Sequence, residues 1–293
     1  MKTLLLLMLT AVSMAITLHT AASDKQQWKL LWQSGPHNDP ESIVYDPNED
    51  VFYVSNQFFK GESGQATISK LNKQGQVIED SWLSGLNEPK GLAIKGSTLF
   101  VTDIDKVHII DIPSRTIIST ATGKGIKFLN DVALDNTGTL YVAEMMNSAV
   151  YRLDMDNIRL VEVIRSEELI NPNGLLFHDN KLYIAGWGKI HDENPANADK
   201  GALVELNLTT MEPKTISHPI GQLDGLQLAP DMKGFLATDY LGGNVYYINP
   251  ETGNAHVTVE TPPLAGDILY IPQQKMLFVP QDNTIYAYQW QEQ

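Results

Sequence analysis

The segment Asn130-Asp-Val-Ala-Leu-Asp-Asn-Thr-Gly-Thr-Leu-Tyr-Val-Ala143 decides the fold class. Two short runs rich in apolar residues stand on either side of Asp135-Asn-Thr-Gly138, which has the composition of a tight turn. The segment therefore predicts a β-hairpin. Helical periodicity is nearly absent elsewhere, and the one short helix expected lies at 166–169.

Six versions of this hairpin follow one another along the chain. The first strands start 40 to 51 residues apart, at Glu41, Lys90, Asn130, Asn173, Asp224 and Gly266. A third strand follows every hairpin, and a fourth follows five of them. Repeats of this length that hold four short strands are typical of β-propeller blades. The sequence predicts an all-β, six-bladed β-propeller with four antiparallel strands in each blade.

The sixth repeat reaches the end of the chain after three strands. The segment Trp28–Gln33 precedes the first repeat and has no other partner, so we expect it to supply the missing strand. Pairing the two ends of the chain would close the ring and remove an exposed sheet edge. No linker interrupts the repeats, so residues 23–293 are predicted to form a single domain.

Residues 1–22 have the features of a signal peptide. Lys2 precedes an apolar run over residues 4–16, and Thr20-Ala-Ala22 provides the small residues of a cleavage site. We expect export to the periplasm or the medium, with a signal anchor as the alternative. No later apolar run reaches the length of a membrane span, so stable membrane insertion is not expected. The chain has no Cys, so the exported domain would depend on its core rather than on disulfides.

The net charge of the chain and the absence of nucleotide-binding motifs limit the kinds of molecule that the protein is expected to bind. A formal net charge of −14 opposes binding to phosphate backbones, so nucleic acid is not an expected partner. Phosphate-binding and dinucleotide-binding loops are absent from the sequence. A small-molecule substrate remains, and the sequence does not indicate an oligomeric state.

The first residues of the six inner strands form a column with unusual chemistry. In a propeller these strands border the central channel, so residues at one register converge there. Apolar or small residues would be expected, yet five of the six are polar, and four carry oxygen ligands: Glu41, Asn130, Asn173 and Asp224. Each residue alone is also a common turn former. Their occurrence together at one register instead favours a shared site.

Two carboxylates and two amide oxygens suit a hard cation such as calcium. The charges of Glu41 and Asp224 would balance a divalent ion, while the amides of Asn130 and Asn173 add ligands without adding repulsion. Four protein ligands fall short of the usual six to eight, which leaves positions for water or substrate. Calcium is the expected cation, with Mg²⁺, Mn²⁺ or Zn²⁺ as alternatives, although the absence of His and Cys from the column argues against zinc.

The motifs around these residues resemble those of a known family. Pro40-Glu41-Ser-Ile-Val-Tyr-Asp46, Leu129-Asn130-Asp-Val-Ala-Leu-Asp135, Asn171-Pro-Asn173-Gly and Leu223-Asp224-Gly are similar to motifs of the senescence-marker-protein/gluconolactonase (regucalcin-like) family, and more distantly to the paraoxonases and diisopropylfluorophosphatase. The resemblance implies a six-bladed propeller with a divalent cation on these four residues. It also implies that Asp224 is the general base.

Three positions depart from the family's pattern. The first motif reads Glu41-Ser rather than the usual Glu-Gly. The sugar-lactone hydrolases usually carry an Arg two residues before the first Asn ligand, where this chain has Phe128. The column also contains Lys90, which points a cation toward the proposed metal. These changes leave the four ligands in place and put a sugar substrate in doubt.

Further residues are candidates for catalysis or substrate binding. Lys90 is expected to hydrogen-bond a substrate carbonyl or carboxylate, and the alternative is an ion pair with Asp131 or Asp267. Asp131 is a candidate for positioning water, and the alternative is a hydrogen bond between strands. Trp187 precedes a long excursion, residues 189–200, that is expected to arch over the channel mouth. Together with Phe128, these are the predicted substrate-binding residues.

Two functions fit these observations. The first is a metal-dependent hydrolase of a lactone or related ester, in which the cation polarises the carbonyl and Asp224 takes a proton from the attacking water. The second is a non-catalytic exported binding propeller in which the cation is structural. The open coordination positions and Lys90 favour the enzyme.

Overall fold

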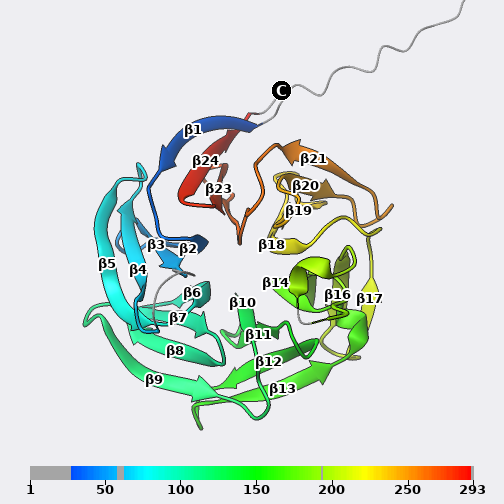
Figure 1. Cartoon of the computed structure of the whole chain (residues 1–293), viewed down its shortest axis with the longest axis horizontal. Helices are drawn as coiled ribbons and strands as arrows, with labels where there is room; N and C mark the ends of the chain where they lie inside the picture. The colour runs from blue at the N-terminus through cyan, green and yellow to red at the C-terminus, as the bar shows by residue number, and fades with distance from the viewer. Residues whose placement is uncertain (1–27, 58–62, 193, 292–293) are drawn as a thin grey trace, which may run out of the picture.

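The computed structural model describes residues 28–57, 63–192 and 194–291, which form a ring of small antiparallel sheets around a central axis (Figure 1). The predicted signal peptide lies outside these residues. The described part of the chain contains no helix with the length and hydropathy of a membrane span. The prediction of an all-β propeller is confirmed.

The strands occur in groups of four along the chain. The first three groups are β2 (Pro40–Asp46), β3 (Val51–Asn56), β4 (Ala66–Asn72) and β5 (Val77–Leu86); β6 (Pro89–Lys95), β7 (Thr98–Asp103), β8 (Lys106–Asp111) and β9 (Thr116–Thr122); and β10 (Leu129–Leu134), β11 (Leu140–Glu144), β12 (Ala149–Asp154) and β13 (Arg159–Arg165). The next two are β14 (Pro172–His178), β15 (Lys181–Gly186), β16 (Leu203–Asn207) and β17 (Glu212–Thr215); and β18 (Leu223–Leu228), β19 (Phe235–Asp239), β20 (Val245–Ile248) and β21 (Ala255–Val259). The last holds β22 (Leu269–Ile271), β23 (Met276–Gln281), β24 (Thr284–Trp290) and β1 (Trp28–Ser34).

These six groups are the predicted blades, which we number one to six from β2. Blades one, four, five and six are separate four-stranded sheets, and blades two and three share one eight-stranded sheet. The junction within that sheet is a single parallel pair, Arg159 of β13 opposite Thr122 of β9. The short helix expected at 166–169 is a 3₁₀ turn, η1 (Glu167–Leu169), and a second turn, η2 (Pro195–Asn197), lies in the excursion between β15 and β16.

The N-terminal strand closes the ring as predicted. β1 pairs antiparallel with β24, from Trp28 opposite Trp290 to Ser34 opposite Ile285. Trp28 is 2% exposed, and its ring lies edge-on to Tyr270 at 5.9 Å. The first and last strands therefore share a core as well as a hydrogen-bond ladder.

The predicted start of the inner strand of blade six is wrong. It was expected to begin at Gly266, but β22 begins at Leu269. The backbone N–H of Gly266 donates to Pro280 O at 3.0 Å, and that of Asp267 donates to Glu41 O of blade one at 2.8 Å. The segment thus keeps one hydrogen bond to β23 of its own blade and makes the next one to the neighbouring blade one.

Apolar side chains fill the space between neighbouring blades. Tyr53 and Trp82 of blade one lie with ring centroids 4.5 Å apart and belong to one buried cluster with Leu99 and Val101 of blade two. Such packing holds the inner strands at fixed positions around the axis. The side chains near the start of each inner strand therefore lie at fixed positions relative to one another.

Candidate functional site

The structure brings the predicted column together at one end of the ring axis. Glu41, Lys90, Asn130, Asn173 and Asp224 are each the second residue of an inner strand, and each is between 1 and 5% exposed. In all five strands the register with the second strand shifts between the first and the fourth residue, the stretch that contains this position. A bulge bends a strand and redirects its side chains, so the same local irregularity turns all five toward the axis.

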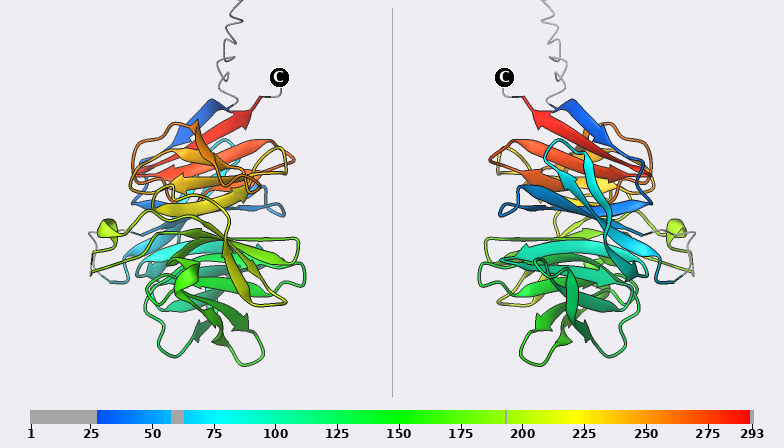
Figure 2. Two further views of the ribbon diagram at one scale, coloured as in Figure 1. Left: turned by 90° about the vertical axis from the view of Figure 1, so that its right-hand side faces the viewer. Right: turned by 90° about the vertical axis from the view of Figure 1, so that its left-hand side faces the viewer.

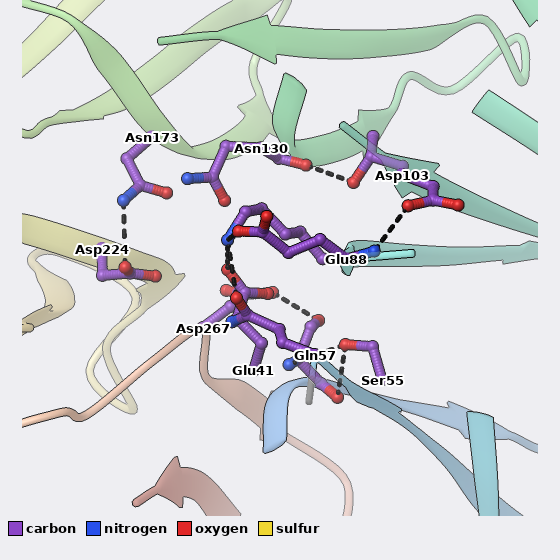
Figure 3. Close-up of polar contacts among 12 residues, drawn as sticks. Glu41, Ser55, Gln57, Glu88, Asp103, Asn130, Asn173, Asp224 and Asp267 are labelled. Atoms are coloured by element: carbon purple, nitrogen blue, oxygen red, sulfur yellow. Dashed lines mark hydrogen bonds and ion pairs between the residues drawn. The ribbon is translucent and has the colours of Figure 1, made fainter. Parts of the chain in front are cut away.

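Four side chains of the column converge in Figure 3. Asn173 Nδ2 donates to Asp224 Oδ2 at 2.9 Å. This hydrogen bond fixes both groups, and it leaves Asn173 Oδ1 and Asp224 Oδ1 buried without a hydrogen-bond partner. Glu41 Oε2 is in the same condition. Buried oxygens without partners are costly, so the site has an unmet requirement for a donor or a cation.

Glycine allows neighbouring inner strands to approach closely at this end of the axis. A Cβ atom at Gly174 would lie 2.0 Å from Asp224 O, and one at Gly91 would lie 2.6 Å from the Asp131 Cα. Both glycines directly follow a column residue. Any larger residue would push the strands apart and separate the column side chains.

Lys90 is held at the edge of the site by several partners. Its Nζ donates to Gln57 Oε1 at 2.9 Å and lies 3.3 Å from Glu88 Oε1 and 3.9 Å from Glu41 Oε1. The same atom lies 4.9 Å from the centroid of the Phe128 ring. Two of the predicted substrate-binding residues, Lys90 and Phe128, are thus neighbours, and Lys90 contacts the acid that begins the column.

The carboxylate of Asp131 accepts hydrogen bonds from backbone N–H groups. Its two carboxylate oxygens accept from Val132 N at 2.6 Å and from Leu175 N of blade four at 2.7 Å. Asp267, its counterpart in blade six, accepts from Ser42 Oγ of blade one at 2.8 Å. These bonds favour the structural alternative for Asp131, a clamp between blades, over a role in positioning water.

The buried acidic side chains at the site outnumber the basic side chains described beside them. Burial raises the pKa of Asp131 to about 8 and that of Asp224 to about 7. Burial also raises the pKa values of Glu41 and Asp267 well above their usual range, and repulsion from Asp224 adds to both shifts. Lys90 opposes the shifts of Glu41 and Asp224. Among the described residues of the site, one buried cation, Lys90, thus faces four buried acids.

The donor set fits a hard cation. The possible ligand atoms are all oxygens, from the carboxylates of Glu41 and Asp224 and the amides of Asn130 and Asn173. Three of these four side chains have a buried oxygen without a hydrogen-bond partner. Among the described residues, no group of three or more His, Cys, Asp and Glu side chains is arranged to hold a metal. The four proposed ligands are two carboxylates and two Asn amides, so they do not form a group of three such side chains.

Trp187 anchors the excursion that was predicted to lie over the channel mouth. Its indole Nε1 donates to Pro195 O at 2.8 Å, and its ring lies 5.7 Å from that of Tyr240. Gln222 Nε2 donates to Ala198 O at 3.1 Å and so ties the far side of the loop to the entry of blade five. Figure 2 shows the excursion projecting from one face of the ring. The indole of Trp187 is buried, which makes it a support of the loop.

A second column of polar residues was not predicted from the sequence. Asp103 accepts from the backbone N–H groups of Asn87 and Glu88, the latter at 2.7 Å, and Glu144 accepts from Phe128 N at 2.8 Å. These acids end the second strands of their blades and hold the loops that enter the inner strands. Aligning the ends of all six second strands would have revealed them, since five are polar: Asn56, Asp103, Glu144, Asp239 and Gln281.

A cavity of about 150 Å³ lies beside the column and was also not predicted. It is lined by Asp39, Pro40, Gln57, Tyr240, Leu264 and Asp282. Pro40 lies in β2, and the other five residues come from loops of blades one, five and six, so no local motif in the sequence predicts the cavity. Pro40 is adjacent to Glu41 in β2, and Gln57 is the partner of Lys90. The cavity therefore opens next to the predicted metal ligands.

Comparison with known proteins establishes the fold alone. No protein-family model and no curated protein matches the chain. Similar solved structures include hydrazine synthase of Kuenenia stuttgartiensis (16% identity, TM-score 0.62, 84% of this chain and 74% of that one), streptogramin B lyase (13%, 0.61, 90% and 97%) and the WD40 domain of Pan2 from Neurospora crassa (11%, 0.58, 92% and 99%). These neighbours include enzymes, and they support a propeller without identifying the regucalcin-like family.

Proposed function

We propose that this chain is a divalent-metal-dependent hydrolase of a lactone or related ester, exported by its N-terminal segment. The observation that carries the proposal is the set of unpartnered buried oxygens on Glu41, Asn173 and Asp224, in a site with excess negative charge. The resemblance of the column motifs to regucalcin-like lactonases agrees with it. Streptogramin B lyase is an example of an enzyme with a similar fold, although fold by itself does not select an activity.

Glu41, Asn130, Asn173 and Asp224 would hold the cation, and calcium matches their chemistry best. A bound divalent cation supplies Lewis-acid polarisation of an ester carbonyl. The hydrogen bond from Asn173 Nδ2 fixes the carboxylate of Asp224 and turns the amide oxygen of Asn173 away from it. One oxygen of each residue, Asn173 Oδ1 and Asp224 Oδ1, has no hydrogen-bond partner and would be available as a ligand.

Asp224 is the proposed general base. Burial raises the pKa of Asp224 to about 7 in the absence of a cation, and a bound cation would lower it, so Asp224 would be ionised and able to accept a proton near neutral pH. As water attacks the carbonyl carbon, its oxygen forms the new C–O bond and its proton passes to Asp224. The bond from that carbon to the ring or ester oxygen then breaks, and Asp224 returns the proton to the departing oxygen. Lys90, held by Gln57 and Glu88, would stabilise the substrate's carbonyl or carboxylate oxygen.

A hydrolysis screen tests the activity directly. Purified protein with calcium should hydrolyse some members of a panel of lactones and aryl esters, and a chelator should remove that activity. The Lys90→Met variant should keep calcium binding but show a raised KM or a lowered kcat, because the variant keeps the length of the side chain and loses its charge. Calcium binding without turnover on any substrate would favour the binding propeller instead.

Calcium and pH should act together on stability. Without a cation, the pKa values of Asp131 and Asp224 are about 8 and 7 when folded, against about 4 for Asp in an unfolded chain. The folded state then binds more protons, so the melting temperature of chelator-treated protein should fall as pH rises from 5 to 8. Calcium should flatten this slope, because it binds the ionised acids of the folded state and displaces their protons.

Calorimetric scans across that pH range measure both slopes. In the Asn173→Ala variant, calcium should stabilise the fold much less, because one ligand and the orienting hydrogen bond of Asp224 are removed. Equal melting temperatures with and without calcium at pH 8 in the wild type would rule out a calcium site in the column.

A further inference from the structure

The two oxygens of the Glu41 carboxylate have different surroundings. Glu41 Oε1 lies 3.9 Å from the ammonium nitrogen of Lys90, whereas Glu41 Oε2 is buried without a hydrogen-bond partner. The oxygen that is left for the proposed cation and the oxygen beside the ammonium group therefore belong to one carboxylate. A divalent cation on Oε2 would be a close neighbour of Lys90, and both carry positive charge.

Water does little to screen this repulsion. The side chains of Lys90 and Glu41 are 6% and 3% exposed. Burial raises the pKa values of Glu41 and Asp224, and Lys90 lowers both, so its charge acts on both carboxylates. Charges that are a few ångströms apart and shielded from water interact strongly. In the absence of a divalent cation, Lys90 thus supplies part of the positive charge that these acids require.

Glu88 is a partner of Lys90 outside the column. Lys90 Nζ lies 3.3 Å from Glu88 Oε1. The backbone N–H of Glu88 donates to Asp103 Oδ1 at 2.7 Å, which fixes the loop that carries Glu88 (Figure 3). The charges of Glu41 and Asp224 together balance a divalent cation. The charge of Glu88 balances that of Lys90, so Glu88 can hold the ammonium group when a cation binds to the column.

We propose that Lys90 is an internal counter-ion of the column: it stabilises the metal-free site through Glu41, it weakens the binding of the divalent cation, and Glu88 retains it when the cation binds. This inference rests on the cation site of the proposed function and specifies what regulates its occupancy. Lys90 would then set the cation concentration at which the site fills, in addition to its proposed contact with the substrate.

The Lys90→Met variant should bind calcium at least about tenfold more tightly than the wild type, because it removes the repelling charge and keeps the length of the side chain. Calorimetric titrations measure both affinities, compared on the high-pH plateau where protons no longer compete with calcium. Lys214→Met is the matched control: it makes the same charge change at an exposed position of β17 and should leave the affinity unchanged. Equal affinities of the wild type and Lys90→Met would overturn the inference.

Stability distinguishes a counter-ion from a residue that only packs. In the presence of a chelator at pH 8, Lys90→Met should melt below the wild type, because removing one partner of a buried ion pair leaves the acids uncompensated. Saturating calcium should remove most of this difference, since the cation replaces the lost positive charge. A merely structural Lys90 would instead give the same difference with and without calcium, and that result would also overturn the inference.

Glu88 provides a test in a different, partly exposed side chain. Glu88→Gln should weaken calcium binding in the wild type, because the ammonium group of Lys90 then loses the partner that balances its charge. In the Lys90→Met background the same substitution should change the affinity several-fold less. Equal effects in the two backgrounds would show that Glu88 acts on the cation directly, which would refute its role as the partner that retains Lys90.

Calcium binding and turnover separate this inference from the proposed activity. If Lys90→Met binds calcium more tightly but neither protein hydrolyses any ester or lactone, the hydrolase proposal fails and the counter-ion stands. If both proteins bind calcium with the same affinity and hydrolyse an ester, the hydrolase stands and the counter-ion fails. If neither protein binds calcium, the cation site fails and the inference fails with it.

Discussion

Replacing Asp224 by asparagine should lower the kcat of hydrolysis by about 10²–10⁴-fold, the range typical of general acid–base catalysis. The variant keeps the size of the side chain and one oxygen toward the axis, and it loses only the group that accepts the proton. Calcium affinity should fall much less than the rate, because Glu41, Asn130 and Asn173 remain. Calorimetric calcium titration and single-turnover kinetics on one substrate measure the two effects separately.

Glu41→Gln is the matched control for this experiment. Glu41 is equally buried and carries an unpartnered oxygen, but it has no proposed role in proton transfer. Its variant should bind calcium more weakly and recover activity when calcium is raised. Full activity of Asp224→Asn on every substrate would refute the role of Asp224 as base. Equal impairment of the two variants at saturating calcium would refute that role as well.

Removing β1 should have the largest effect on stability. A chain that begins at residue 35 loses the pairing with β24 and the packing of Trp28. Loss of a buried Trp costs about 3–5 kcal/mol, and at about 2–4 °C per kcal/mol the melting temperature should fall by roughly 10 °C or more. The exposed edge of β24 should also promote aggregation. Calorimetry and light scattering against a chain that begins at residue 23 measure both.

Two point variants separate packing from chain length. Trp28→Ala should reproduce much of the loss, since its side chain is buried between Tyr270 and Trp290. Leu31→Ser lies in the same strand with an exposed side chain and should change the melting temperature little. An unchanged melting temperature after truncation would show that the ring does not depend on β1.

The repeat was predictable because its information is local. Each hairpin combines two short apolar strands with a turn of Asp, Asn and Gly, and those residues specify the same structure in every copy. The exception is instructive. Gly266 still donates to Pro280 O of its own blade, but Asp267 donates to Glu41 O of blade one, and this second bond depends on the closed ring. The regular strand therefore begins only at Leu269.

The sequence allowed us to predict which residues share the site, but not which hydrogen bonds and ion pairs they form. Alignment of the repeats placed Glu41, Asn130, Asn173 and Asp224 at one register, and the ring geometry brings them together. Their partners could not be predicted in this way. An ion pair of Lys90 with Asp131 or Asp267 was the alternative, but these acids bind Leu175 N and Ser42, whereas Lys90 reaches Gln57 and Glu88. Gln57 follows β3 and Glu88 lies in a loop, outside the aligned strands.

The closure of the ring by β1 also constrains the order of folding. β1 emerges first during synthesis, yet its partner β24 ends at Trp290, so the strand must wait for almost the whole chain. Pairings between such distant segments form slowly, because loop-closure entropy is lost before their contacts are gained. Glu41 lies in the first blade and Asp224 in the fifth. The four oxygens can therefore converge only when most of the chain has folded, and a partly folded chain has no complete site.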